Sequence, residues 1–165
     1  MVDTPLPTLV RELMTVGVAT CSPQTPIVEL VAFFLEEGLE DIIVLDEGHA
    51  LGTVGQGELV RAFTRPGARD LKAEDVMREG VAQIPPDLPL VTAAQIMQDL
   101  GVRTLFLMHH ASGFEYPAAA ISYKHLLRHL AAQTGDDLRD LGIKAVRRLP
   151  LETYIQRRDQ TRQAR

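Results

Sequence analysis

Two stretches of the chain carry the same pattern of residues without a gap. The first is RELMTVGVATCSPQTPIVELVAFFLEEGLEDIIVL, residues 11–45, and the second is EDVMREGVAQIPPDLPLVTAAQIMQDLGVRTLFLM, residues 74–108. Eight of the 35 aligned positions are identical, including the pairs Pro23/Pro86, Pro26/Pro89 and Gly38/Gly101. After a loop of different length the agreement resumes, where Val54, Leu59 and Val60 align with Ile121, Leu126 and Leu127. A repeat of about 60 residues therefore occurs twice between Arg11 and Ala132.

Each copy predicts the element order β-α-β-β-α, which places the chain in the α+β class. The first helix of each copy is expected to begin at Pro26 or Pro89 and to end at Gly38 or Gly101, because proline suits a helix start and glycine a helix end. Apolar residues at Ile27, Leu30 and Phe34 recur at helical spacing. Strands are predicted at 18–21, 42–45 and 51–54 in copy one and at 81–84, 104–108 and 118–121 in copy two. Closing helices are predicted at 57–63 and 123–133, and the loops at 46–50 and 109–116.

The composition excludes several classes of protein. With 45% apolar and 24% charged residues in 165, the chain is neither disordered nor fibrous. Its single cysteine, Cys21, rules out an intramolecular disulfide and favours a location in the reducing cytoplasm. We expect the Cys21 side chain to be buried in a strand as a small hydrophobic group. No apolar run approaches the roughly 18–20 residues needed to span a bilayer, and no secretory signal is evident at the start. We therefore expect a cytoplasmic protein with no membrane partner.

Charge is spread unevenly along the chain. The net charge is −5, yet residues 139–165 carry eight basic and three acidic side chains. An acidic body of net charge −10 is therefore followed by a basic tail of +5, which argues against nucleic-acid binding by the main fold. In the tail, Leu151, Tyr154 and Ile155 have helical spacing and are expected to dock on the module, and 136–141 is expected to form a short helical turn. Three hypotheses remain for the arginine-rich tail. It forms a frayed helix end or a helix that crosses to a second subunit, its arginines bind an anion in the ligand cleft, or they contact an acidic partner or RNA.

The repeated pattern resembles the cystathionine β-synthase (CBS) domain, two of which in tandem form a Bateman module. The resemblance is carried in copy one by residues 10–14, 18–23, 38, 42–46, 52–54 and 58–59, and in copy two by residues 73–77, 81–86, 101–102, 121–122 and 125–126. It implies two repeats, 1–68 and 69–133, packed as an intramolecular pseudo-dimer, followed by a helical extension at 134–165. It also implies a homodimer of two chains and a regulatory module without catalytic activity.

CBS domains often bind adenosine compounds at a strand-turn-helix that aims a helix N-terminus at the ligand. The family places Thr or Ser at the turn and Asp three residues later, for phosphate and ribose respectively. This chain departs from that pattern, with Gly55 and Glu58 in copy one and Ser122 and His125 in copy two. The resemblance predicts one ligand site at Thr20, Gly55, Gln56 and Glu58, and a second at Gln83, Ser122, Lys124 and His125. Their ligand is expected to be AMP, ATP, S-adenosylmethionine or an NAD-like compound. A partner enzyme or transporter is expected to be regulated by the binding of this ligand.

Two rival functions stay open. The degraded ribose positions also fit a ligand-free dimerisation or interaction module. An enzyme is disfavoured, since no paired catalytic carboxylates, nucleophile elbow or phosphate loop is present. His125 and His129 are four residues apart on a predicted helix, as in some metal sites. No nearby carboxylate has the spacing needed to act as a further metal ligand, so no metal is expected. The acids at 36, 37, 40 and 41 are interpreted as a solvated corner, with a site for a cation or a basic partner as the alternative.

Overall fold

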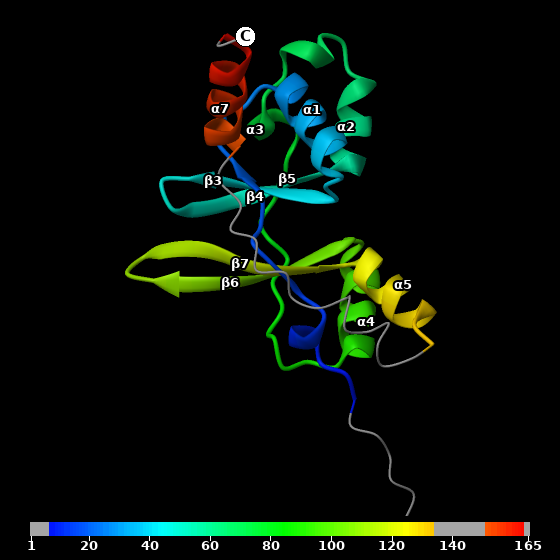
Figure 1. Cartoon of the computed structure of the whole chain (residues 1–165). Coiled ribbons are helices and arrows are strands. Elements are labelled where there is room, and N and C mark those ends of the chain that lie inside the picture. The colour runs from blue at the N-terminus through cyan, green and yellow to red at the C-terminus, as the bar shows by residue number, and fades with distance from the viewer. Residues whose placement is uncertain (1–6, 134–150, 164–165) are drawn as a thin grey trace, which may run out of the picture. The chain divides into compact units, whose positions relative to one another are not determined.

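A computed structural model describes residues 7–133 and 151–163 (Figure 1). Contacts between residues divide these into two compact units, each described by itself. The copy-one unit comprises Val18–Val81, His109–Pro117 and the C-terminal helix, and the copy-two unit comprises 7–17, 82–108 and 118–133. The architecture is α+β with two repeats and a C-terminal helix, as predicted. The pairing of the repeats into a pseudo-dimer stays a prediction.

The copy-one unit contains a four-stranded sheet in the order β2-β3-β4-β5. β2 (Thr20–Cys21) is parallel to β3 (Asp41–Asp46), whereas β4 (His49–Gly55) is antiparallel to both β3 and β5 (Arg78–Glu79). The remaining elements are α1 (Ile27–Glu37), α2 (Gln56–Phe63), the 3-10 turn η2 (Ala68–Asp70), α3 (Ala73–Val76) and α7 (Leu151–Gln163). α1 buries Leu30, Phe33 and Phe34 against the sheet residues Ile42, Val44 and Val54. One face of the sheet is therefore covered by helices, and this side holds the core.

The copy-two unit contains a three-stranded sheet in the order β1-β7-β6. Its strands are β1 (Thr15–Val16), β6 (Thr104–Ala111) and β7 (Phe114–Ser122), and its helices are η1 (Val10–Glu12), α4 (Leu90–Leu100) and α5 (Tyr123–Ala131). The tips of β6 and β7 belong to the copy-one unit. α4 packs Leu90, Ala93 and Met97 against Leu105 and Ile121, which repeats the packing of α1.

The segments at the start of the two copies occupy exchanged positions. Val10, Leu13 and Met14 lie at the start of copy one in the chain but in the core of the copy-two unit. Their repeat equivalents Ala73, Val76 and Met77 lie at the start of copy two but pack in the copy-one unit. A repeat counted along the sequence is therefore not the same as a compact unit. The boundaries 1–68 and 69–133 describe the sequence repeat and stay predictions for domains.

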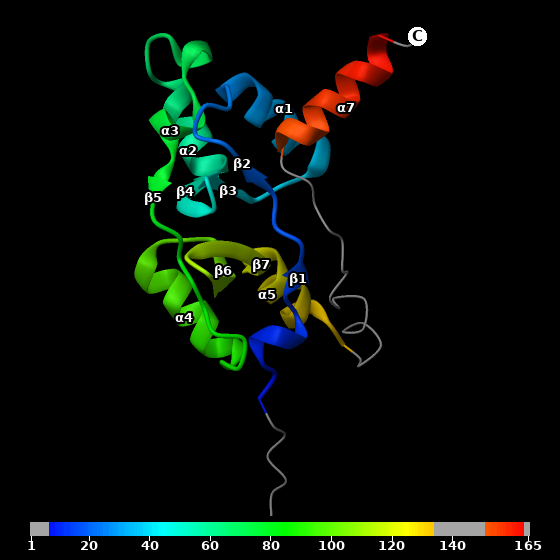
Figure 2. The ribbon, with the colours of Figure 1, turned by 90° about the vertical axis from the view of Figure 1, so that its left-hand side faces the viewer.

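α7 lies beside α1 on the helix-covered side of the copy-one sheet (Figures 1 and 2). Leu151 is buried in the core with Cys21 and Leu30, and Ile155 packs against the same cluster. The predicted docking of these two residues is confirmed, whereas the side chain of Tyr154 and the predicted turn at 136–141 lie outside the described residues. The C-terminal extension thus contributes to the core of a repeat from which it is distant in sequence.

Several sequence predictions were wrong in detail. The first helices begin at Ile27 and Leu90, one residue after the prolines, which are N-caps; both helices end at left-handed glycines, as predicted. No strand spans 81–84, where only Gln83 bridges to Phe106. Residues 109–116 are not a loop, because β6 and β7 continue to a turn in which Ser112 and Gly113 adopt φ of 52° and 81°. There Phe114 stacks on His49 with ring centroids 6.5 Å apart, which favours extended strands over a loose loop.

Candidate functional site

Two candidate residues of the copy-one unit, Thr20 and Gly55, share one face of its sheet. Thr20 is paired with Ile43, and Ile43 with Thr53. Their neighbours in sequence, such as Cys21, Val44 and Val54, point into the helix-covered core. Because side chains alternate along a strand, the row from Thr20 to Thr53 faces away from α1 and α2, and so does Gly55, two residues after Thr53. Thr20 stands two strands, or about 10 Å, from β4, so it shares the face but not the immediate surroundings of Gly55.

Gly55 forms the turn between β4 and α2 and lies between two carboxylates. Its backbone N–H donates to Glu58 Oε2 at 3.0 Å, which caps the N-terminus of α2. Across the hairpin Gly55 is paired with Asp41. A Cβ at position 55 would lie 2.3 Å from Asp41 Oδ1 and 3.1 Å from Glu58 Oε2. The place of the family's Thr or Ser side chain is thus filled by the carboxylate of Asp41.

Gln56 and Glu58 lie in the first turn of α2, directly after Gly55. Gln56 is exposed, and its side-chain amide reaches Leu39 O at 3.4 Å, a long hydrogen bond. Glu58 is partly buried, and one of its carboxylate oxygens accepts the hydrogen bond from Gly55 N–H. The structure therefore brings Gly55, Gln56 and Glu58 together, with the carboxylates of Asp41 and Glu58 at the turn. Carboxylate oxygens accept hydrogen bonds, so they suit hydroxyl donors.

The copy-two unit presents its candidate residues in the same way. Ile84, Leu105 and Ile121 point into the core, so their neighbours Gln83, Phe106 and Ser122 lie on the opposite face of the sheet. Gln83 is exposed beside Phe106, to which it is bridged. Ser122 is buried at the N-cap of α5, and Lys124 is exposed in the first turn of that helix. Lys124 is thus the only cation among the eight candidate residues.

His125 is held by hydrogen bonds at both ring nitrogens. Its Nδ1 lies 3.0 Å from the Ser122 backbone nitrogen and 3.0 Å from Ser122 Oγ, and its Nε2 lies 2.6 Å from Thr15 Oγ1. The backbone N–H of Ser122 can only donate, so Nδ1 accepts and the proton of a neutral ring is assigned to Nε2, which donates to Thr15. His125 therefore caps α5 as Glu58 caps α2. It also ties the helix to β1.

Two residues of these sites were not predicted from the sequence. Asp41 was interpreted as part of a solvated acidic corner, yet it is partly buried against Gly55. The pairing of 41 with 55 across the β3–β4 hairpin is the signal that would have identified it. Thr15 gave no signal, because the strand β1 that carries it reaches His125 only through the exchange of segments between units.

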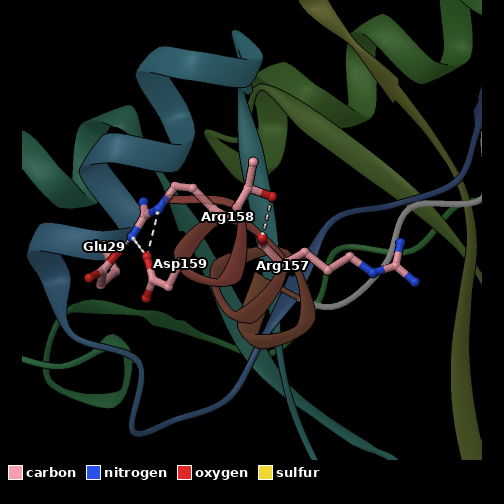
Figure 3. Close-up of polar contacts among 5 residues, drawn as sticks. Glu29, Arg157, Arg158 and Asp159 are labelled. Atoms are coloured by element: carbon pink, nitrogen blue, oxygen red, sulfur yellow. Dashed lines mark hydrogen bonds and ion pairs between the residues drawn. The ribbon is translucent and has the colours of Figure 1, made fainter. Parts of the chain in front are cut away.

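The described part of the tail forms ion pairs on the helix-covered side of the copy-one unit. Arg158 Nη2 lies 3.3 Å from Glu29 Oε2 of α1, and the guanidinium also donates to Asp159 Oδ1 at 3.2 Å (Figure 3). The hydrogen bond to Asp159 is the main cause of a raised Arg158 pKa; burial opposes it, and the charges of Asp159 and Glu29 add to it. Arg157 points away from this pair. Arg158 is therefore engaged beside α1 and not on the candidate face.

Within 7–133 and 151–163, no group of three or more His, Cys, Asp or Glu side chains is arranged to hold a metal ion. In that same part of the chain, no helix combines the length and apolar character needed to cross a membrane.

Comparison with protein families and solved structures gives consistent results. The model of the CBS domain matches residues 10–65 and again residues 73–132. No curated protein matches the chain. The CBS domain pair of protein MJ0100, solved with 5′-methylthioadenosine and S-adenosyl-L-methionine, is 15% identical, with a TM-score of 0.66, over 78% of this chain and 99% of that one.

Two other solved structures share the fold. The hexameric CBS-CP12 protein from bloom-forming cyanobacteria is 19% identical over 74% of this chain and 68% of that one, with a TM-score of 0.63. The CBS-domain protein ATU1752 from Agrobacterium tumefaciens is 19% identical over 70% of this chain and 90% of that one, with a TM-score of 0.62. At these identities the similarity establishes the fold alone.

Proposed function

Because the chain belongs to the CBS-domain family, with two matched copies, we propose that it is a regulatory module that binds an adenosine-type ligand and has no catalytic activity. The observation that carries the proposal is that each unit presents a strand-turn-helix with a hydrogen-bonding side chain three residues after the turn. That residue is Glu58 after Gly55 in one unit and His125 after Ser122 in the other, and only Ser122 also keeps the family's hydroxyl at the turn. A neighbour of the same fold binds 5′-methylthioadenosine and S-adenosyl-L-methionine.

The residues favour the nucleoside part of such a ligand over its phosphates. Glu58 Oε2 accepts the hydrogen bond from Gly55 N–H, so we expect the second carboxylate oxygen to accept hydrogen bonds from ribose hydroxyls. Asp41 adds a second carboxylate at the same turn, and carboxylate oxygens accept hydrogen bonds from hydroxyl groups. In the copy-two unit the exposed Lys124 can pair with a phosphate group. We therefore propose that Thr20, Gln56 and Glu58 contact a nucleoside, and that Gln83, Ser122 and Lys124 tolerate a nucleotide.

The experiment is a thermal-shift titration of the whole chain with AMP, ATP, S-adenosylmethionine, 5′-methylthioadenosine and NADH, confirmed by calorimetry. A ligand at 100 times its Kd stabilises the folded state by about 2.7 kcal/mol, which is a shift of several degrees. Glu58→Gln removes a charge at the first turn, and Lys124→Gln does so at the second. Each is expected to weaken binding at its own site, with ribose 5-phosphate as the ligand control without adenine.

A ligand-free interaction module is the second candidate, and one observation favours it. Both N3 side chains, Glu58 and His125, already cap their own helices and so have a structural role without any ligand. Absence of a shift with every adenosine compound at millimolar concentration would support this function and refute the first. A shift that Glu58→Gln or Lys124→Gln abolishes would exclude it.

A further inference from the structure

The turns before α2 and α5 are capped at the same position by different chemical groups. The third residue of α2 is Glu58, whose Oε2 accepts the N–H of Gly55 at 3.0 Å. The third residue of α5 is His125, whose Nδ1 lies 3.0 Å from the backbone nitrogen of Ser122. Both pairs follow the geometry of a capping box. Only the cap of α5 is built from a side chain that ordinarily changes its charge between about pH 5 and 8.

Protonation of His125 at Nδ1 is incompatible with this cap. The backbone N–H of Ser122 can only donate, so Nδ1 has to present its lone pair to it. The neutral ring then carries its single proton on Nε2, which donates to Thr15 Oγ1 at 2.6 Å. A second proton would place an N–H group against an N–H group. At acid pH the fold therefore has either to keep the ring neutral or to lose the cap.

The charges on the elements next to the ring oppose its protonation. In the described part of the copy-two unit, α5 packs against α4, its first N–H donates to the segment before β6, and the ring reaches β1. The titratable and charged side chains on α4, α5 and that segment are Asp99, Arg103, Tyr123, Lys124, Arg128 and His129, whereas β1 and residues 118–122 of β7 carry none. Three cations thus accompany one carboxylate on these elements, and a helix N-terminus adds positive partial charge. Both effects disfavour an imidazolium at position 125.

The ring of His125 also connects the start of α5 to β1. Thr15 of β1 is paired with Ala120 of β7, two residues before the buried Ser122. The ring, β1 and the end of β7 therefore form one closed set of contacts around the turn. Loss of the cap loosens this whole turn, which also carries the exposed Lys124, and not the helix end alone.

We propose that His125 is a pH-sensitive cap, which holds the turn before α5 when its ring is neutral and releases that turn when the ring is protonated. The equivalent turn before α2 is capped by a carboxylate and has no such switch. The consequence for ligands rests on the proposed function: release of the cap displaces Ser122 and weakens binding at the turn before α5. The switch itself requires no ligand.

Urea denaturation of the whole chain at about pH 8 and about pH 5.5 tests the switch. At one pH unit below its ordinary value of about 6.5, a free imidazole is about 90% protonated, so keeping the ring neutral lowers the folding equilibrium constant by up to about tenfold. In His125→Gln the amide oxygen can accept the same N–H at either pH, so this additional loss should disappear. The matched control is His129→Gln, one turn further along α5, which should keep the loss. The other histidines, His49, His109, His110 and His129, are present in both the wild type and His125→Gln and do not affect their comparison.

Nitrogen NMR of the isotope-labelled wild-type ring decides the matter even if His125→Gln does not fold. At about pH 8 we expect Nδ1 without a proton and Nε2 with one, and a proton on Nδ1 would overturn the proposal. An equal pH dependence of stability in the wild type and in His125→Gln would overturn it as well.

The consequence for ligands has its own assay, so that its failure is distinct from that of the switch. Calorimetry with 5′-methylthioadenosine, which has no group that titrates in this range, should show binding at least about threefold weaker at about pH 6 than at pH 8, and His125→Gln should remove this difference. Equal affinities at the two pH values in the wild type would overturn the consequence for ligands. If no adenosine compound binds at either pH, the proposed function is refuted, while the denaturation and NMR results still decide the switch.

Discussion

Replacement of Leu151 by alanine should destabilise the copy-one unit, although this residue lies outside both matched repeats. Leu151 is 1% exposed and packs with Cys21 and Leu30 in the core. Truncation of a buried leucine to alanine costs 2–5 kcal/mol, depending on how far the surroundings collapse into the cavity. Among the side chains that the structure describes, Leu151, Ile155 and the Arg158–Glu29 pair hold α7, so we expect the helix to shift and fill part of the space. We therefore expect a loss of about 2–3 kcal/mol in the free energy of unfolding.

Urea denaturation followed by far-ultraviolet circular dichroism is the suitable assay, because the chain contains no tryptophan to report by fluorescence. With a slope of about 1–3 kcal/mol per molar, the expected loss lowers the midpoint by about 0.7–3 M. The matched control is Gln160→Ala at an exposed position of the same helix, which should change the stability by no more than about 0.5 kcal/mol. If Leu151→Ala behaves like the control, α7 is not docked in solution and the reasoning is refuted.

Three further predictions concern the candidate sites and the core. His125→Ala should cost about 1 kcal/mol, because α5 loses its cap, whereas Lys124→Ala in the same turn should be nearly neutral; equal urea midpoints would refute the capping role. Gly55→Ser, which introduces the family's hydroxyl, should cost about 1 kcal/mol by displacing Asp41, and Asp41→Ala should recover it in a double-mutant cycle; additive effects would contradict the contact. Cys21 is buried in the core, so a thiol reagent should modify it only after unfolding; rapid reaction of the native chain would contradict its burial.

Elements that depend on local sequence were predicted most accurately. Both long helices end at Gly38 and Gly101 as expected, since the left-handed conformation at a helix end is decided by the residue itself. β3 and α2 were found within one residue of their predicted bounds, because their apolar patterns are continuous. The loop predicted at 109–116 failed because its strands are held by contacts distant in sequence, such as Phe114 on His49. Polar residues in an extended hairpin give little signal of their own.

In the candidate sites too, local features were predictable from the sequence and contacts between distant residues were not. The sequence placed Gly55, Glu58, Ser122 and His125 at the turns before two helices, where the structure has them. What they contact was not predictable, since Asp41 reaches Gly55 through a hairpin register and Thr15 reaches His125 through an exchanged segment. The sequence alone accordingly predicted where these residues lie in the secondary structure, whereas their role in ligand binding stays a proposal. It did not identify the carboxylate that makes the first turn acidic.

The repeat, the family and the α+β class follow from the sequence by itself, because a pattern of apolar and turn residues that occurs twice specifies two copies of one local arrangement. Only the tertiary structure decided where the flanking segments pack. Val10 and Met14 complete the core of one unit, and Ala73 and Met77 that of the other, while Leu151 fills the core beside α1. Burial of an apolar side chain depends on the space left by residues far away in the chain, and no local pattern records that space.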